Sequence, residues 1–88
     1  MKQVVLALAI AAFSSTAFAA ANCEKHPKNE WMSETDAKAR LTEQGYKIQK
    51  FKVDGDCYEI YGTNKEGKKV EIYFDTKSLA VVKSEIKK

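Results

Sequence analysis

The sequence predicts an α+β fold in which one N-terminal helix packs on a four-stranded antiparallel β-meander. Three observations support this prediction: one helical segment with a capping signal at each end, four later runs of strand-forming residues, and short turn-forming connections between those runs. Connections this short force neighbouring strands to run antiparallel. A chain of this length has room for one small core and for no second domain.

Residues 1–21 have the pattern of a secretory signal peptide. Lys2 gives a short basic start, and a nearly unbroken apolar run over 4–13 follows it. The run is shorter than the roughly 18 to 20 residues that a membrane-spanning helix needs. Small residues indicate cleavage after Ala19 or Ala21, which leaves 69 or 67 residues. We therefore expect a periplasmic or secreted protein without membrane anchoring after signal cleavage.

Charge gives little indication of a nucleic-acid partner. Once the signal peptide is removed, 14 basic residues stand against 12 acidic ones, a net charge of +2. Basic and acidic side chains alternate through the strand region and form no long block of one sign. We therefore expect no nucleic-acid binding, and we expect a monomer.

Cys23 and Cys57 are the only cysteines, and we expect them to form a structural disulfide. An exported chain meets oxidising conditions, and a domain this small gains from a covalent link. Closing a loop of about 35 residues is worth roughly 4 kcal/mol in the chain-entropy model. The alternative is a metal site that combines both thiols with His26 and a carboxylate, but the thiols would oxidise first. No metal and no cofactor are therefore predicted.

The helix is the first regular element expected in the mature chain. An extended lead-in over 22–32 precedes it, and the folded domain is predicted over 33–88. Ser33 with Asp36 resembles a capping box at the start of the helix, and Gly45 supplies the stop signal at its end. The stripe of apolar residues on this helix is too narrow for it to be stable alone, so it must dock on the sheet.

Four strands are expected after the helix. The Asp54-Gly55 pair is a strong hairpin signal, and polar turn residues separate the later runs. A change in the phase of apolar residues predicts a bulge near Gln49-Lys50. The expected strands cover 46–53, 57–62, 69–74 and 79–85.

Alternation along the strands assigns side chains to two faces of the sheet. One face packs under the helix and contains Tyr58, Ile60, Val70, Ile72 and Phe74. The other face is left uncovered and contains Glu59, Tyr61, Glu71 and Tyr73. On an uncovered face we expect the two glutamates to be solvated and to have ordinary pKa values.

No catalytic constellation is evident, so we expect a protein that is not an enzyme. His26, the only histidine, has no serine or free thiol placed to act as its nucleophile. Asp54 and Asp56 flank a glycine, but the twelve-residue calcium loop and its closing glutamate are missing. The turn-forming role of Asp-Gly accounts for this pair.

The order of these elements resembles the PepSY domain family, named for peptidase propeptides and the YpeB protein. The resemblance rests on Ser33-Glu34, Ala37, Gly45-Tyr46, the run Asp56-Cys57-Tyr58-Glu59-Ile60 and the run from Gly67 to Asp75. The sequence departs from the family at Thr76-Lys77-Ser78, where a glycine-containing turn is usual. The resemblance implies a non-catalytic module that modulates or inhibits envelope peptidases.

Two functions of different classes follow from these observations. The first is a periplasmic interaction module whose partner is an envelope peptidase or another periplasmic protein. Its candidate binding residues are Glu59, Tyr61, Glu71 and Tyr73, because tyrosine is enriched at interfaces. The simpler interpretation is that Tyr61 and Tyr73 only stabilise the sheet as a cross-strand pair. The second function is a small-ligand-binding or redox-accessory periplasmic protein that depends on Cys23, His26 and the tyrosines.

Overall fold

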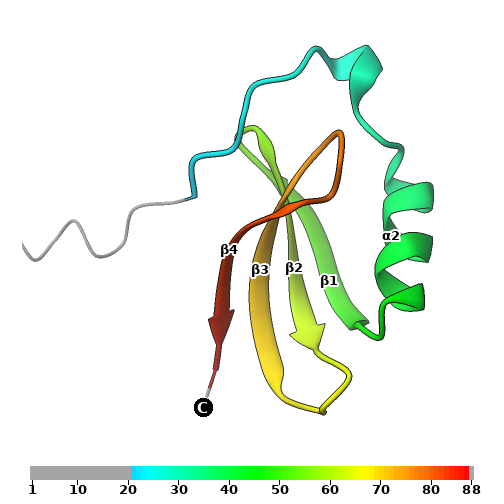
Figure 1. Cartoon of the computed structure of the whole chain (residues 1–88), viewed down its shortest axis with the longest axis vertical. Coiled ribbons are helices and arrows are strands. Elements are labelled where there is room, and N and C mark those ends of the chain that lie inside the picture. Colours follow the sequence, from blue (N-terminus) through cyan, green and yellow to red (C-terminus); the bar gives the residue numbers. More distant parts are fainter. Residues whose placement is uncertain (1–20, 88) are drawn as a thin grey trace, which may run out of the picture.

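The computed structural model describes residues 21–87 and shows one helix beside a four-stranded antiparallel sheet (Figure 1). The elements are η2 (Lys28–Glu30), α2 (Glu34–Glu43), β1 (Lys47–Asp54), β2 (Cys57–Thr63), β3 (Lys69–Asp75) and β4 (Val81–Ile86). Apart from Ala21, the predicted signal peptide lies outside the described residues. Within them, no helix is long and apolar enough to cross a membrane.

Helix α2 begins and ends where the sequence predicts. The Ser33 hydroxyl accepts a hydrogen bond from the Asp36 N–H at 3.1 Å, which satisfies one free donor of the first turn. Gly45 follows the helix with φ of +104°, a conformation that glycine adopts without strain. The Tyr46 N–H then donates to the Leu41 carbonyl at 3.1 Å, as in a Schellman motif. Both predicted capping signals are therefore confirmed.

The strand order is β1-β2-β3-β4, so each strand pairs with its neighbours in sequence. The predicted meander is confirmed, and the first three strands agree with their expected bounds to within one residue. The fourth strand was expected from residue 79 but begins at Val81. Leu79 instead occupies the turn with φ of +63°, and its N–H donates to the Asp75 carbonyl at 2.9 Å.

A bulge in β1 is accommodated by a glycine in β2. The β1–β2 register shifts between Ile48 and Lys50, so Gln49 is the extra residue and the predicted bulge is confirmed. At this point the backbone of β1 passes very close to Gly62. A Cβ atom on Gly62 would overlap the carbonyl oxygen of Lys47, so only glycine fits here.

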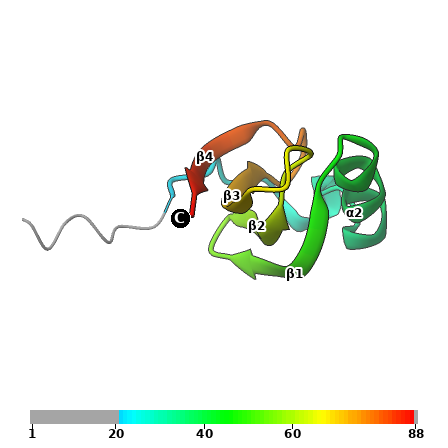
Figure 2. The same ribbon diagram turned by 90° about the horizontal axis from the view of Figure 1, so that it is seen from below.

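The core lies between α2 and one face of the sheet. Seen from below in Figure 2, the helix lies at one side of the sheet next to β1. The buried cluster consists of Ala37, Leu41, Tyr58, Ile60, Val70, Ile72, Phe74 and Leu79. Full burial of each large apolar side chain contributes roughly 1.5 to 3 kcal/mol. The predicted core face is therefore confirmed, with Leu79 as an addition from the β3–β4 turn.

The lead-in also contributes to this core. The Trp31 ring packs edge-on against the Tyr58 ring with centroids 5.5 Å apart. The Tyr58 hydroxyl donates to the Met32 carbonyl, so this buried phenol has a partner. Burial raises the pKa of Tyr58, and the negative charge of Glu34 adds to the effect. The residues before the helix are therefore part of the folded unit.

Candidate functional site

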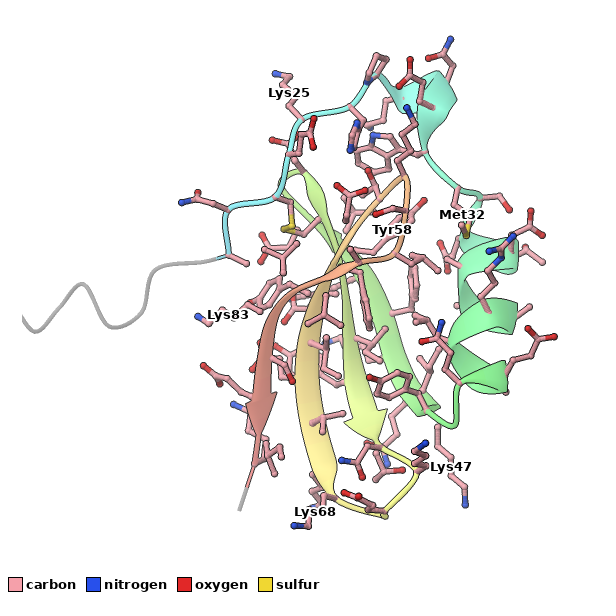
Figure 3. All side chains as sticks on the ribbon, viewed as in Figure 1. Lys25, Met32, Lys47, Tyr58, Lys68 and Lys83 are labelled. Atoms are coloured by element: carbon pink, nitrogen blue, oxygen red, sulfur yellow. A yellow bond between two sulfur atoms is a disulfide. The ribbon has the colours of Figure 1, made fainter. Side chains whose placement is uncertain are left out.

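A disulfide fixes the lead-in to the first residue of β2. Cys23 and Cys57 are bonded, with their Cα atoms 5.4 Å apart, and the bond is visible at the end of the sheet in Figure 3. The predicted pairing is confirmed. Because the bond uses both sulfur atoms, the alternative metal site with two free thiolates is not formed in this structure.

A second anchor joins the lead-in to the β3–β4 turn. The His26 Nε2 atom lies 2.9 Å from Asp75 Oδ1, and each side chain is only 12% exposed. The other carboxylate oxygen of Asp75 accepts hydrogen bonds from the N–H groups of Lys77 and Ser78 and from the Ser78 hydroxyl. The lead-in predicted over 22–32 is thus held to the end of β3 by a hydrogen bond between residues 49 positions apart.

These contacts set the charge of Asp75. Burial alone would raise the pKa of this carboxyl group, but hydrogen bonds from the Ser78 N–H and from His26 outweigh it and lower the pKa to about 2. Asp75 is therefore ionised at neutral pH and holds the turn and the lead-in together.

Among the described residues, His26 and Asp75 could, together with Glu24, offer ligands to a metal ion. Glu24 Oε1 lies 3.9 Å from His26 Nε2, and one ligand atom from each of Glu24, His26 and Asp75 lies within 4.8 Å of the others. One nitrogen and two oxygens would suit a divalent transition metal. However, Glu24 is 77% exposed, and Asp75 already accepts hydrogen bonds at both oxygens. The structural role of the cluster accounts for its geometry.

The four candidate binding residues lie together on the face of the sheet opposite the core. In the β2–β3 register, Glu59 pairs with Tyr73 and Tyr61 pairs with Glu71. We call these four residues the tyrosine–glutamate cluster. The face assignment made from alternation is confirmed, while the role in binding stays a prediction.

The expectation that both glutamates are solvated is wrong for Glu59. Its side chain is 1% exposed, and neither carboxylate oxygen has a hydrogen-bond partner. The Nζ atom of Lys52 lies 3.7 Å from Oε1. Glu59 is on a central strand, with Lys52 and Tyr73 directly opposite and Tyr61 two residues along. These neighbours on both adjacent strands lie within reach of the carboxyl group.

The two carboxyl groups have opposite pKa shifts, so the expectation of ordinary pKa values is wrong for both Glu59 and Glu71. Burial raises the pKa of Glu59, and its interaction with Glu71 raises it further. The pKa of Glu71 is lowered to about 2, chiefly because protonated Glu59 can donate to it. Glu71 also lies 3.0 Å from Lys87 Nζ and accepts a hydrogen bond from the Tyr73 hydroxyl at 3.2 Å. In this cluster the protonated form is therefore favoured for Glu59 and the ionised form for Glu71.

The tyrosine hydroxyls remain protonated over the physiological range. The neighbouring carboxyl groups of Glu71 and then of Glu59 favour the protonated phenol and raise the pKa of Tyr61 to about 12. Burial, followed by the charges of the two glutamates, raises the pKa of Tyr73. Both groups can donate hydrogen bonds, but neither is activated as a nucleophile or base.

Lysines flank the tyrosine–glutamate cluster on both edge strands. The Nζ atoms of Lys50 and Lys52 on β1 each lie 5.8 Å from the centre of the Tyr61 ring. On β4, Lys83 lies 5.9 Å from the Tyr73 ring centre. These are cation–π distances. The surface thus presents aromatic rings and cations, with the acidic groups lying deeper.

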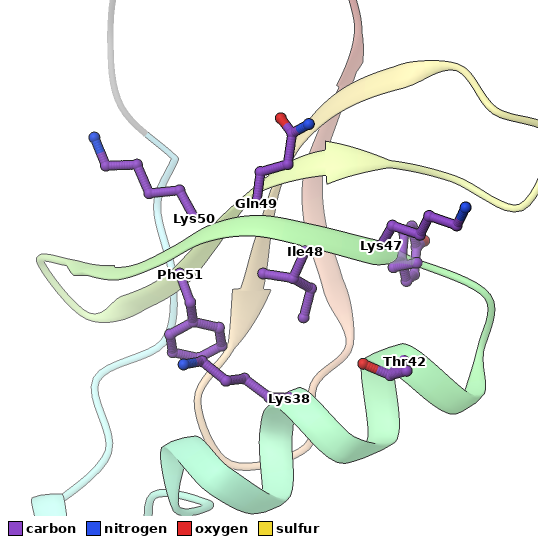
Figure 4. A pocket seen from close by; sticks show the side chains of 8 residues that line it. Lys38, Thr42, Lys47, Ile48, Gln49, Lys50 and Phe51 are labelled. Atoms are coloured by element: carbon purple, nitrogen blue, oxygen red, sulfur yellow. The ribbon is translucent and has the colours of Figure 1, made fainter.

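A separate hollow lies between α2 and β1, with a volume of about 370 Å³. Figure 4 shows Ile48 and Phe51 pointing toward the helix, while Gln49 and Lys50 point away from it. Lys38 reaches from α2 to within 5.6 Å of the Phe51 ring centre. Sequence analysis did not predict this hollow, although the bulge at Gln49 was its signal. Its lining consists of Lys38, Thr42, Tyr46, Lys47, Ile48, Gln49, Lys50 and Phe51.

Comparison with known families gives one result. The model of the peptidase propeptide and YPEB domain family, PepSY, matches residues 3–85. The chain belongs to this family. PepSY domains are generally non-catalytic, propeptide-like or regulatory modules, and they are typically extracellular or periplasmic. Their association with peptidases supports a general role in binding a protein partner. Neither the curated proteins nor the solved structures give a match.

Proposed function

We propose that this PepSY protein is a non-catalytic interaction module of the periplasm that modulates an envelope peptidase. The observation that carries the proposal is the pair Tyr61 and Tyr73, which lie on a sheet face that α2 leaves uncovered. Both rings are partly exposed and have lysines beside them. Rigid aromatic side chains with polar tips are typical of protein-binding hot spots.

The contact surface differs in one respect from the set of residues that the sequence predicted. Glu59 is buried beneath its neighbours and cannot touch a partner in this arrangement. We propose that Glu59 lies beneath the rings of Tyr61 and Tyr73 and supports them, together with Glu71. We therefore propose that the two tyrosines and the flanking lysines make the contacts, while Glu71 holds the Tyr73 hydroxyl through a hydrogen bond.

The remaining reactive groups support a non-catalytic function. Among residues 21–87, His26 anchors the lead-in through Asp75, and Cys23 and Cys57 are joined in a disulfide. We also propose that export removes the signal peptide after Ala19 or Ala21, so that the lead-in starts just before the disulfide. Intact mass of the periplasmic protein tests this assignment.

Capture from envelope extract tests the docking surface. The exported protein is immobilised, and the bound peptidases are identified by mass spectrometry. Tyr61→Ala and Tyr73→Ala should each abolish capture at a temperature where circular dichroism shows the variant folded. Tyr46→Ala is the matched control, because Tyr46 packs against Phe74 on the core side, with ring centroids 6.1 Å apart. Undiminished capture by both folded cluster variants would reject the proposal.

A further inference from the structure

Strand β4 is an edge strand with an unusually apolar surface. It is the last strand of the sheet, so among residues 21–87 no strand pairs with its outer edge. Val81, Val82 and Ile86 are 54%, 40% and 57% exposed, and they are three of the four large hydrophobic residues exposed in the described chain. An edge of this kind is a template for pairing with another strand.

The hydrogen bonds of β4 to β3 determine which of its backbone groups face outward. The Lys87 N–H donates to the Lys69 carbonyl at 2.8 Å, so Lys87 is turned toward β3. Backbone groups alternate along a strand, and Glu85 and Lys83 are therefore also turned inward. The N–H and carbonyl groups of Ser84 and Ile86 then point away from β3, at the free edge of the sheet, and are available to another chain.

The charges on β4 favour a particular pairing with a second copy of the same strand. If Ser84 pairs with Ser84 of the second copy, Lys83 lies opposite Glu85 in both directions, and Val82 lies opposite Ile86. A register centred on Lys83 would place lysine against lysine, and one centred on Glu85 would place glutamate against glutamate. Opposite charges across a strand pair stabilise it, and like charges destabilise it.

We propose that this PepSY protein forms a dimer in which two β4 strands pair antiparallel about Ser84. The two-fold axis runs perpendicular to the sheet, as the antiparallel pairing of identical edges requires. The two sheets then join into one, and both tyrosine–glutamate clusters face the same side. This proposal replaces the monomer expected from the sequence, and it does not depend on the peptidase-modulating function.

The contact is short, so the dimer should depend on concentration. The bulge between Tyr73 and Phe74 in the β3–β4 register falls at Val82, so the pairs of Val82 with Ile86 are the last of the ladder at each end. An interface this small lies at the weak end of specific contacts. Its effect would be to present two docking surfaces together, which raises avidity for a partner with two sites.

Sedimentation velocity of the exported protein tests the proposal. Wild-type protein should shift from monomer toward dimer between about 5 and 500 µM. Ser84→Pro removes the outward N–H at the centre of the pairing, a change that an edge strand tolerates, and it should keep the protein monomeric. Ser84→Ala retains the N–H and should dimerise like the wild type. Circular dichroism checks that each variant is folded.

A charge exchange tests the register itself. Lys83→Glu and Glu85→Lys alone should each weaken the dimer by about tenfold, because two favourable pairs become repulsive. The double variant restores opposite charges across the same pairs and should recover the wild-type dissociation constant. Thermal melting, run in parallel, separates this effect from the 3.8 Å contact between Lys83 and Glu85 within one chain.

Either of two outcomes would overturn the proposal. One is a wild-type protein that stays monomeric at the highest concentration, even if its edge strand binds some other protein. The other is a folded double variant that dimerises no better than the single variants. In neither case would the result bear on whether Tyr61 and Tyr73 capture a peptidase, so the two proposals fail separately.

Discussion

The carboxyl group of Glu59 lies at the centre of the uncovered sheet face without a hydrogen-bond partner. Leaving a buried polar group in this state costs about 1 to 3 kcal/mol. Protonation relieves the cost, because a neutral carboxyl group can donate to Glu71. The raised pKa of Glu59 and the lowered pKa of Glu71 both follow from this arrangement.

We predict that Glu59→Gln stabilises the protein at pH 8. A carboxyl group whose pKa is raised on folding contributes stability below its unfolded pKa of about 4.3 and loses it as pH rises through the folded value. Glutamine imitates the protonated form and removes this loss. The free energy of unfolding in urea at pH 8 should therefore rise by about 1 to 3 kcal/mol, and the gain should shrink toward pH 4.

Glu66→Gln in the exposed β2–β3 turn is the matched control and should change the stability little at either pH. A Glu59→Gln variant that is less stable than the wild type at pH 8 would contradict the prediction. That result would mean that Glu59 is ionised and stabilised by the 3.7 Å contact with Lys52.

At the scale of single elements, the bulge in β1 depends on a residue in the neighbouring strand. Gln49 is the extra residue, and the displaced backbone of β1 leaves no room for a side chain at position 62. The bulge allows Ile48 and Phe51 to point toward the helix together, as Figure 4 shows. Gly62 is therefore required for packing between β1 and α2.

We predict that Gly62→Ala lowers the free energy of unfolding by about 2 to 4 kcal/mol, because the new methyl group overlaps the Lys47 carbonyl oxygen. Chemical denaturation measures this effect. Gly55→Ala is the control: its φ is +62°, but no atom lies within 4 Å of the added methyl, so only backbone strain of about 1 to 2 kcal/mol remains. If both variants cost the same, close approach at Gly62 is not the reason for glycine there.

Sequence reasoning predicted features that depend on neighbouring residues. The caps of α2 at Ser33 and Gly45, the bulge near Gln49 and the face assignment each follow from patterns within a few positions. The disulfide was predictable because no other cysteine competes. Local patterns predict these features because the residues that make the contacts are close together in the sequence.

Contacts between distant residues could not be predicted in the same way. The hydrogen bond between His26 and Asp75 spans 49 residues, and no spacing rule indicates it. Glu59 is buried on a central strand with Lys52 and Tyr73 as its partners on the adjacent strands, and alternation along a single strand does not reveal such burial. Leu79 takes a positive φ that few non-glycine residues adopt, so the expected start of β4 was two residues too early.

At the scale of the whole molecule, the lead-in acts as a strap around one end of the sheet (Figure 1). It is fixed by the disulfide to β2, by His26 to the β3–β4 turn and by Trp31 to the core. Such a small domain buries a limited core, so these three anchors provide a large share of its stability.

We predict that replacing Cys23 and Cys57 together with serine lowers the melting temperature while the far-UV spectrum stays close to native. The chain-entropy model gives an upper value of roughly 4 kcal/mol for the loss. His26 and Trp31 still hold the lead-in, so the secondary structure should persist. Thermal unfolding followed by circular dichroism measures both quantities. An unchanged melting temperature, or two titratable thiols in the native protein, would contradict the structural role of the bond.

We propose that the uncovered sheet face modulates a peptidase, and peptidase activity in envelope extract with the purified protein added tests this role. The wild-type protein should change the rate of casein hydrolysis in a saturable manner. A folded variant with Tyr61→Ala and Tyr73→Ala combined should leave the rate at its basal value, while Tyr46→Ala should act like the wild type. An equal change from wild type and double variant, or no change from wild type at any concentration, would contradict a role of this face in modulating the peptidase.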